Sequence, residues 1–441
     1  MKLNLFLLIL CIAFIFVFRN TLAQLELPQK SPLAEVFQKI GNTDIKIVYH
    51  SPAVNSRIIW GGLVPFGKIW RTGANEATTI EFGTKVKIEN IEIDAGKYSL
   101  FTIPGKDEWT VILNADHKQW GAYSYDGGRD VIRFQVKPLT SAFNERLKFS
   151  FPDVETTSGS LCLQWEKIAI KFKIESHLTD PEDKNIRVSP LVSLKQRVGL
   201  TDVQISYGSP AVRNRIIWGE LVPFRKVWRT GANEATTIEF NHDIKLNNQP
   251  LRAGRYSFFT IPEEKTWAII INHVADQWGA FQYDRSKDVL RFTATPKRSS
   301  EFNERLVFTI DDTEISKSKI RLSWENLTIV IPIETEVHNY ALENINVAIA
   351  NNPGDWITFA SAAQYAADYN IFTKQSIEWI NKSIELKEHY WNYYIKAQLY
   401  KNLGDKKAAK KLAGKSRILG ESDSENFAGF EETLKKLENS L

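Results

Sequence analysis

The stretch that decides the fold is Trp70–Phe82, WRTGANEATTIEF, because the same letters recur unchanged at Trp228–Phe240. The offset between the two copies is 228 − 70 = 158 residues. After one inserted residue, an offset of 324 − 165 = 159 carries Trp165 onto Trp324. A repeat of this length marks a whole structural unit that occurs twice. The sequence therefore predicts a tandem duplication.

The repeat divides the chain of 441 residues into parts, and a length of about 150 residues per domain makes three domains a reasonable number. The two copies cover residues 31–175 and 189–334. Between them, residues 176–188 are polar and contain proline, which is typical of a linker. Residues 338–441 follow with a different, helical pattern. We expect two homologous domains and a smaller C-terminal domain.

Within each copy the hydrophobic residues alternate with polar ones, as they do in half-buried strands. The clearest runs in the first copy are Trp109–Leu113, Val131–Val136 and Ile168–Ile174. Roughly nine short strands without a helix-length segment predict antiparallel sheets that cover each other's apolar faces. The fold class is therefore mainly β, with two β-sandwich or jelly-roll-like domains. Residues 31–40 fit either a short helix or an edge strand.

The last hundred residues read as helices with caps and turn residues between them. The expected segments are 355–370, 373–386, 390–402, 405–419 and 425–437. Ala363-Gln364 recurs as Ala397-Gln398, an offset of 34 residues, which is the period of tetratricopeptide helix pairs. We expect an all-α domain of helical hairpins that is tetratricopeptide-like, with a plain helical bundle as the alternative.

The composition bounds the class of protein. It is 43% hydrophobic and 24% charged with a mean hydropathy of −0.28, which excludes a disordered, a multispan membrane or a fibrous chain. The net charge of +4 is too balanced for a nucleic-acid partner. Ten of the 13 tryptophans form five pairs between the copies, and we expect them to fill the cores. These pairs are 60/218, 70/228, 109/267, 120/278 and 165/324.

The N-terminus reads as a secretory signal peptide, residues 1–23. Lys2 precedes the apolar run Leu5–Phe18, and a small residue, Ala23, stands at the expected cleavage site. The run is short for a membrane-spanning helix, which needs about 20 apolar residues, and this favours a cleaved signal peptide. A retained membrane anchor is the alternative. Export to the periplasm or the extracellular space follows. Cleavage would leave Cys162 as the only cysteine, expected to be a buried structural thiol.

No histidine is shared by the two copies, which excludes a histidine mechanism or zinc site common to both. Gly208 stands opposite His50, and Ala275 stands opposite His117. A histidine site could survive in one copy only, and these two are the residues to watch. We therefore expect no metal and no cofactor.

The copies do share a cluster of polar and aromatic residues. Its members are Trp70, Arg71, Asn75 and Glu76 in the first copy and Trp228, Arg229, Asn233 and Glu234 in the second. Arginine, amide and carboxylate groups beside an indole are the groups that bind sugars and small anions. The alternative is fold maintenance, with Asn75 in a left-handed turn and Arg71 paired to Glu76.

Paired carboxylates offer an enzymatic alternative. Glu76 with Asp126, or Glu76 with Glu81, would be the acid and base of a glycosidase-like hydrolase. Other polar residues are shared as well, including the pairs Asn114/Asn272, Tyr125/Tyr283 and Asp126/Asp284. Nothing in the sequence fixes the separation of these side chains in space.

The string IWGGLVPFGKIWRTGANEATTIEF (59–82), followed by AGKYSLFTIP (95–104) and WTVILNADHKQWGA (109–122), resembles the family of domain of unknown function 2911. The resemblance covers both copies. The second copy departs from it at Glu220, Arg225 and Glu263-Glu264. It implies exported bacterial proteins with a β-rich fold and brings no established activity or catalytic residues.

The function that these features favour is an exported, non-catalytic binding or scaffolding protein. The shared cluster would recognise a small polar or glycan ligand, and the helical domain would contact a protein partner. No nucleic acid is expected, and a membrane only through an uncleaved signal segment. The alternatives are the carboxylate-dependent hydrolase and a purely structural envelope protein.

Overall fold

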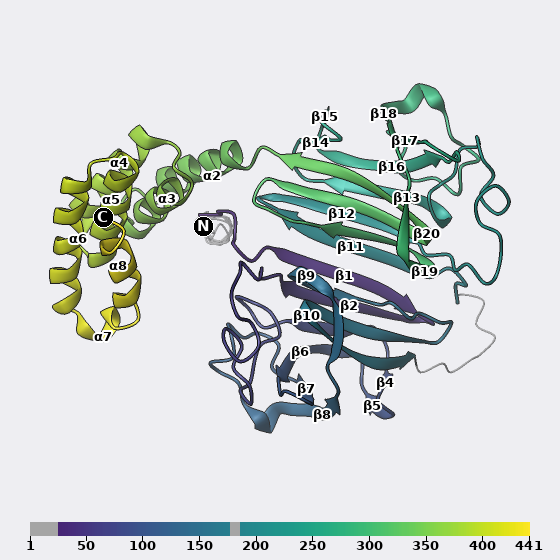
Figure 1. The fold of residues 1–441 in the computed structure, drawn as a ribbon, viewed down its shortest axis with the longest axis horizontal. Helices are drawn as coiled ribbons and strands as arrows, with labels where there is room; N and C mark the ends of the chain where they lie inside the picture. Colours follow the sequence, from purple (N-terminus) through teal and green to yellow (C-terminus); the bar gives the residue numbers. More distant parts are fainter. Residues whose placement is uncertain (1–24, 177–185) are drawn as a thin grey trace, which may run out of the picture. The chain divides into compact units, whose positions relative to one another are not determined.

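The computed structural model describes residues 25–176 and 186–441 of the chain. The predicted signal peptide, 1–23, lies outside the described residues, as does 177–185 of the predicted linker. The chain forms two compact units, a β unit at Pro28–Val337 and a helical unit at His338–Leu441 that includes residues 25–27 (Figure 1). Each unit is described here by itself.

Each copy of the repeat folds into two antiparallel sheets, one of six strands and one of four. In the first copy the six-stranded order is β1-β2-β3-β6-β7-β8 and the four-stranded order is β5-β4-β10-β9; the second copy repeats both orders. The mainly β, sandwich-like fold class is confirmed. The strands of the first copy are β1 (Leu33–Ile40), β2 (Thr43–His50), β3 (Thr79–Phe82), β4 (Val86–Ile88), β5 (Ile91–Ile93), β6 (Gly96–Ile103), β7 (Trp109–Asn114), β8 (Asp130–Val136), β9 (Leu139–Ser150) and β10 (Ser158–Ser176). Those of the second are β11 (Leu191–Val198), β12 (Thr201–Gly208), β13 (Ala232–Phe240), β14 (Ile244–Leu246), β15 (Gln249–Leu251), β16 (Gly254–Ile261), β17 (Trp267–Asn272), β18 (Asp288–Ala294), β19 (Lys297–Asp311) and β20 (Lys317–Thr335).

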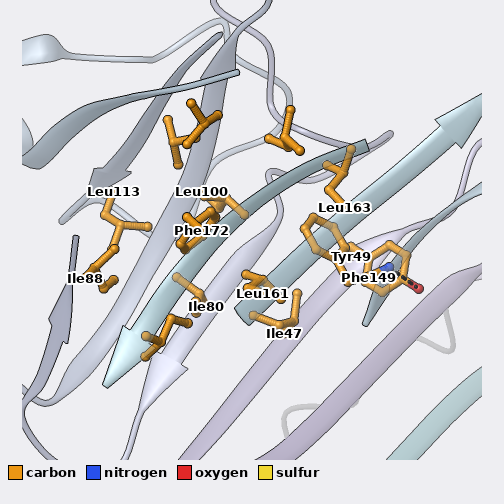
Figure 2. Packing of buried hydrophobic residues seen from close by; sticks show 14 of the residues in the cluster. Ile47, Tyr49, Ile80, Ile88, Leu100, Leu113, Phe149, Leu161, Leu163 and Phe172 are labelled. Atoms are coloured by element: carbon orange, nitrogen blue, oxygen red, sulfur yellow. Dashed lines mark hydrogen bonds between the residues drawn. The ribbon is translucent and has the colours of Figure 1, made fainter. Parts of the chain in front are cut away.

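The core of each sandwich lies between its two sheets. In the first copy Ile47 on β2 and Leu163 on β10 face the same apolar cluster (Figure 2). Four of the five paired tryptophans gather in this core: Trp165 lies 5.7 Å from Trp60 and stacks on Trp70 at 5.9 Å, and Trp60 lies 4.8 Å from Trp109. The second copy reproduces these distances to within about 0.1 Å. Indoles therefore supply much of this core. The single described cysteine, Cys162 on β10, is also buried, although it does not belong to this apolar cluster.

The two sandwiches share one sheet of twelve strands, because β1 pairs with β11. Within residues 31–40, for which the sequence allowed a short helix or an edge strand, Leu33–Ile40 thus forms a strand in the middle of a sheet. Val36 lies opposite its own counterpart Leu194, since 36 + 158 = 194, so the two copies meet about a pseudo-twofold axis. An edge strand exposes unpaired N–H and C=O groups, and pairing the two edges covers both.

Two arginines reinforce this junction in the same symmetric way. Arg146 donates from Nη1 to the Ser51 carbonyl at 2.8 Å and from Nε to the Thr313 carbonyl in the other copy. Its counterpart Arg305 donates to the Ser209 and Val154 carbonyls. Burial lowers the pKa of both guanidinium groups. Because a buried charge is stable only when hydrogen-bonded, these contacts fix the two sandwiches to each other.

The helical unit consists of short helices joined by tight turns. They are α2 (Val337–Asn351), α3 (Trp356–Tyr369), α4 (Thr373–Leu386), α5 (Tyr390–Asn402), α6 (Lys406–Glu421), α7 (Ser424–Phe427) and α8 (Glu431–Glu438). The C-terminal all-α region is confirmed. Helix α2 was not among the expected segments, and the expected segment 425–437 is two helices, α7 and α8.

Helices α3 and α5 lie side by side in the helical unit. Gln364 on α3 donates to Gln398 on α5 at 2.8 Å, and the neighbouring Ala363 and Ala397 are fully buried. Residues 34 positions apart in the sequence are therefore neighbours in space, as the period predicted. Asp355 begins α3 by accepting the backbone N–H groups of Ile357 and Thr358. Among the described helices, none is both long and apolar enough to cross a membrane.

Candidate functional site

A cavity of about 600 Å³ opens in the β unit beside the predicted cluster of the first copy. His50, Glu76, Gln119 and Trp120 line it from the first sandwich, and Arg197 on β11 lines it from the second. The other lining residues are Gln29, Leu33, Val48, Tyr49, Ala77, Thr79, Lys97, His117 and Lys118. The β1–β11 pairing thus contributes to the wall of the cavity.

A tight turn before β3 presents Asn75 and Glu76 to this region. Thr72 and Asn75 have φ angles of 55° and 54°, the left-handed conformation, as predicted for Asn75. The turn is closed by the Thr78 hydroxyl, which donates to the Thr72 carbonyl at 2.9 Å, and by the Trp70 indole, which donates to the Gly73 carbonyl at 3.1 Å. A conserved backbone shape of this kind explains why both copies keep the same letters.

His50, at the end of β2, connects the two polar side chains of the turn. Its Nε2 lies 2.7 Å from Glu76 Oε2, and its Nδ1 lies 3.0 Å from Asn75 Nδ2. Asn75 Nδ2 also donates to Gln29 Oε1 at 3.1 Å. A neutral imidazole with its proton on Nε2 satisfies both contacts, and a protonated one can donate instead to the Ser31 carbonyl, 3.0 Å from Nδ1. Glu76 is thereby held at the cavity by a histidine that is 8% exposed.

Arg71 does not form the ion pair with Glu76 that the sequence suggested, because Glu76 pairs with His50 instead. Among the described residues its buried Nε has no hydrogen-bond partner, and the same is true of Arg229 Nε. Burial lowers the pKa of both guanidinium groups. Neither arginine is among the residues that line the cavity.

The tryptophan that lines the cavity is Trp120, which is 61% exposed, and not Trp70. Trp70 and Trp228, the indoles that the sequence predicts beside the cluster, are buried in the two tryptophan clusters, and Trp70 does not line this cavity. All five tryptophan pairs recur in both copies, so the sequence alone does not distinguish the four indoles of the core from the exposed one. The sequence did single out His50 and His117, and both line the cavity.

In the second copy the corresponding side chains form an ion pair with each other. Arg187, the counterpart of Gln29, donates two hydrogen bonds to Glu234 at 2.7 and 2.8 Å. Burial raises the pKa of Glu234, but the Arg187 contacts outweigh it, so the pKa lies below its ordinary value. Asn233 keeps the turn contact, donating to the Ser189 carbonyl at 3.2 Å. The carboxylate here is already neutralised by an arginine of the same chain.

The substitution of His50 by Gly208 accounts for the local difference in backbone. Gly208 pairs with Ala232, so β13 begins at Ala232, whereas β3 begins only at Thr79. A Cβ atom at Gly208 would lie 2.2 Å from the Ala232 carbonyl oxygen. In the second copy the β12–β13 pairing thus extends to Gly208, whereas in the first copy the imidazole of His50 occupies the corresponding position.

The carboxylate pairs of the hydrolase alternative do not meet at this cavity. Asp126 caps a short 3-10 helix by accepting the Gly128 N–H at 2.8 Å, and Glu81 lies on β3 opposite Lys97. Neither lines the cavity that Glu76 lines. A paired acid and base at Glu76 therefore has no geometric support from these residues.

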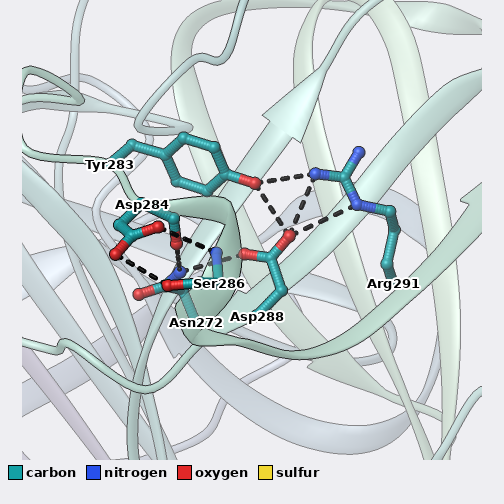
Figure 3. A network of polar contacts seen from close by, with 6 residues as sticks. All are labelled: Asn272, Tyr283, Asp284, Ser286, Asp288 and Arg291. Carbon is teal, nitrogen blue, oxygen red and sulfur yellow. Dashed lines mark hydrogen bonds and ion pairs between the residues drawn. The ribbon is translucent and has the colours of Figure 1, made fainter.

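The other polar residues shared by the copies form a closed network. Figure 3 shows it in the second copy. Asn272 and Tyr283 each donate a hydrogen bond to the Asp288 carboxylate, and Arg291 donates to both Asp288 and the Tyr283 hydroxyl. The first copy repeats these contacts, where burial and the Asp130 hydrogen bond raise the pKa of Tyr125 to about 12. Because these polar groups form hydrogen bonds with one another, they stabilise the packing of β7 with β8 and of β17 with β18.

Together these features define a protein of two fused β-sandwiches with a cavity that is lined mainly by the first. The family model described as "Protein of unknown function (DUF2911)" matches residues 31–174 and 189–333, so the chain belongs to this family as a tandem pair. No curated protein and no solved structure matches the chain. Within residues 25–176 and 186–441, no group of three His, Cys, Asp or Glu side chains could hold a metal ion.

Proposed function

We propose that the chain is an exported, non-catalytic binding protein whose first β domain holds a small polar or glycan ligand in the cavity beside Glu76. The observation that carries the proposal is the His50–Asn75–Glu76 cluster at the edge of a 600 Å³ cavity with an exposed indole on its wall. Carboxylate and amide groups bind hydroxyls, and an indole face packs against the apolar face of a sugar ring.

The geometry of the cluster supports binding because its polar groups are held in place before a ligand arrives. The turn fixes Asn75 and Glu76 by backbone contacts, and His50 restrains the carboxylate. A site that is ordered in advance loses less conformational entropy on binding. Export is part of the proposal and rests on the Leu5–Phe18 segment. A protein partner for the helical domain is also part of it, since stacked helical hairpins present extended binding surfaces.

Trp120→Ala is expected to weaken the binding of any oligosaccharide that wild type binds by about 10-fold, because the stacking face is lost. The measurement is isothermal titration calorimetry of the full chain, after a thermal-shift screen of neutral and acidic oligosaccharides. Trp278→Ala is the matched control, because Trp278 is the counterpart of Trp120 and is equally exposed at 59%. The proposal fails if no member of the screen binds wild type, or if the two variants weaken binding equally.

A further inference from the structure

Two lysines on the wall of the cavity occupy positions that form an ion pair in the other copy. Lys97 on β6 and Lys118 after β7 both line the cavity. Adding 158 gives their counterparts, Arg255 and Asp276, whose side chains meet at 2.6 Å. The two positions are therefore within ion-pair reach of each other. In the first copy both carry positive charge.

The cavity as a whole carries more positive than negative charge. Among its lining side chains, Lys97, Lys118 and Arg197 are cations and Glu76 is the one carboxylate, already in contact with His50. Arg197 donates to Asp202 at 2.8 Å. Glu81 lies across the ladder from Lys97, and both lysines are exposed where they line the cavity. Like charges that line one cavity repel each other, and an anion bound between them relieves the repulsion.

From this arrangement, and building on the proposed function, we infer that the ligand is a saccharide with an anionic substituent, a carboxylate or a sulfate. The sugar ring packs on Trp120, a hydroxyl donates to Glu76, and the anionic group lies between Lys97 and Lys118. In the second copy the carboxylate of Asp276, which stands at the position of Lys118, neutralises the cation at the other position, Arg255. The second copy thus balances this charge within the chain, whereas in the first copy an anionic ligand would balance it.

The test exchanges the charge pattern of one copy for that of the other. The double variant Lys97→Arg, Lys118→Asp installs a pair that the fold already accommodates in the second copy. The probes are uronic-acid oligosaccharides with their methyl esters, and sulfated oligosaccharides with their desulfated forms. Wild type is expected to bind an acidic form at least 10-fold more tightly than its neutral partner. The double variant is expected to lose this preference and keep the affinity for the neutral form.

The control is Arg255→Lys, Asp276→Lys, which gives the second copy the lysine pair and leaves the first unchanged; the preference of the first site is expected to persist. Equal affinity of wild type for acidic and neutral forms would overturn the inference while leaving the proposed function intact. Binding of no probe at all would overturn both. Retention of the acidic preference by the double variant would also overturn the assignment to Lys97 and Lys118.

Discussion

Trp165→Ala is expected to lower the free energy of unfolding of the β unit by about 3–5 kcal/mol. Trp165 is 1% exposed and contacts two further indoles, Trp60 and Trp70, at ring distances of 5.7 and 5.9 Å. Truncation removes the transfer free energy of the indole and leaves a cavity that rigid neighbouring rings cannot fill. Guanidinium chloride unfolding followed by far-ultraviolet circular dichroism measures the change.

Two variants calibrate this result. Trp324→Ala in the second copy is expected to cost about as much, because its ring contacts match. Trp120→Ala removes an exposed indole and is expected to cost less than about 1 kcal/mol. A loss below about 1 kcal/mol for Trp165→Ala would contradict the account of the core.

Gly208→Ala is expected to destabilise the chain by about 2–4 kcal/mol, since the new methyl group would lie 2.2 Å from the Ala232 carbonyl oxygen. The neighbouring backbone must move, and the β12–β13 ladder opens at its end. The same denaturant experiment measures the cost.

The control for this glycine is Gly414→Ala in α6, where an added Cβ meets nothing within 4 Å. There the substitution is expected to be neutral or to stabilise by up to about 1 kcal/mol, because alanine is the better helix former. If Gly208→Ala is equally harmless, the closed ladder of the second copy does not explain the difference between the copies.

Local features of this fold could be predicted from the sequence, and contacts between distant segments could not. Alternating apolar residues predict the strands, and the letters Gly73-Ala74-Asn75 predict a left-handed turn that the structure has at Asn75. The pairing of β1 with β11 has no such local signal, because the residues of a strand do not show whether one or both of its edges are paired. The joined sheet therefore emerges only in three dimensions.

The candidate site shows the same division. The identical letters of the two copies pointed to Asn75 and Glu76, yet the cavity is distinguished by residues that differ between the copies. His50 lies 26 positions before Glu76 in the sequence and reaches it because β2 pairs with β3, at whose start the turn lies. The position of Trp70 beside Arg71 predicts an indole at the site, but the hydrophobic effect favours its burial in the core. Positions that changed after duplication were the informative ones.

On the proposed function, the chain has one working site, which is formed mainly by the first copy and is closed in the second. Isothermal titration calorimetry with the tightest-binding oligosaccharide of the screen tests it most directly. The account predicts one ligand per chain, an affinity at least 10-fold weaker in Glu76→Gln, and no change in Glu234→Gln. Two ligands per chain, or equal losses in the two variants, would contradict it.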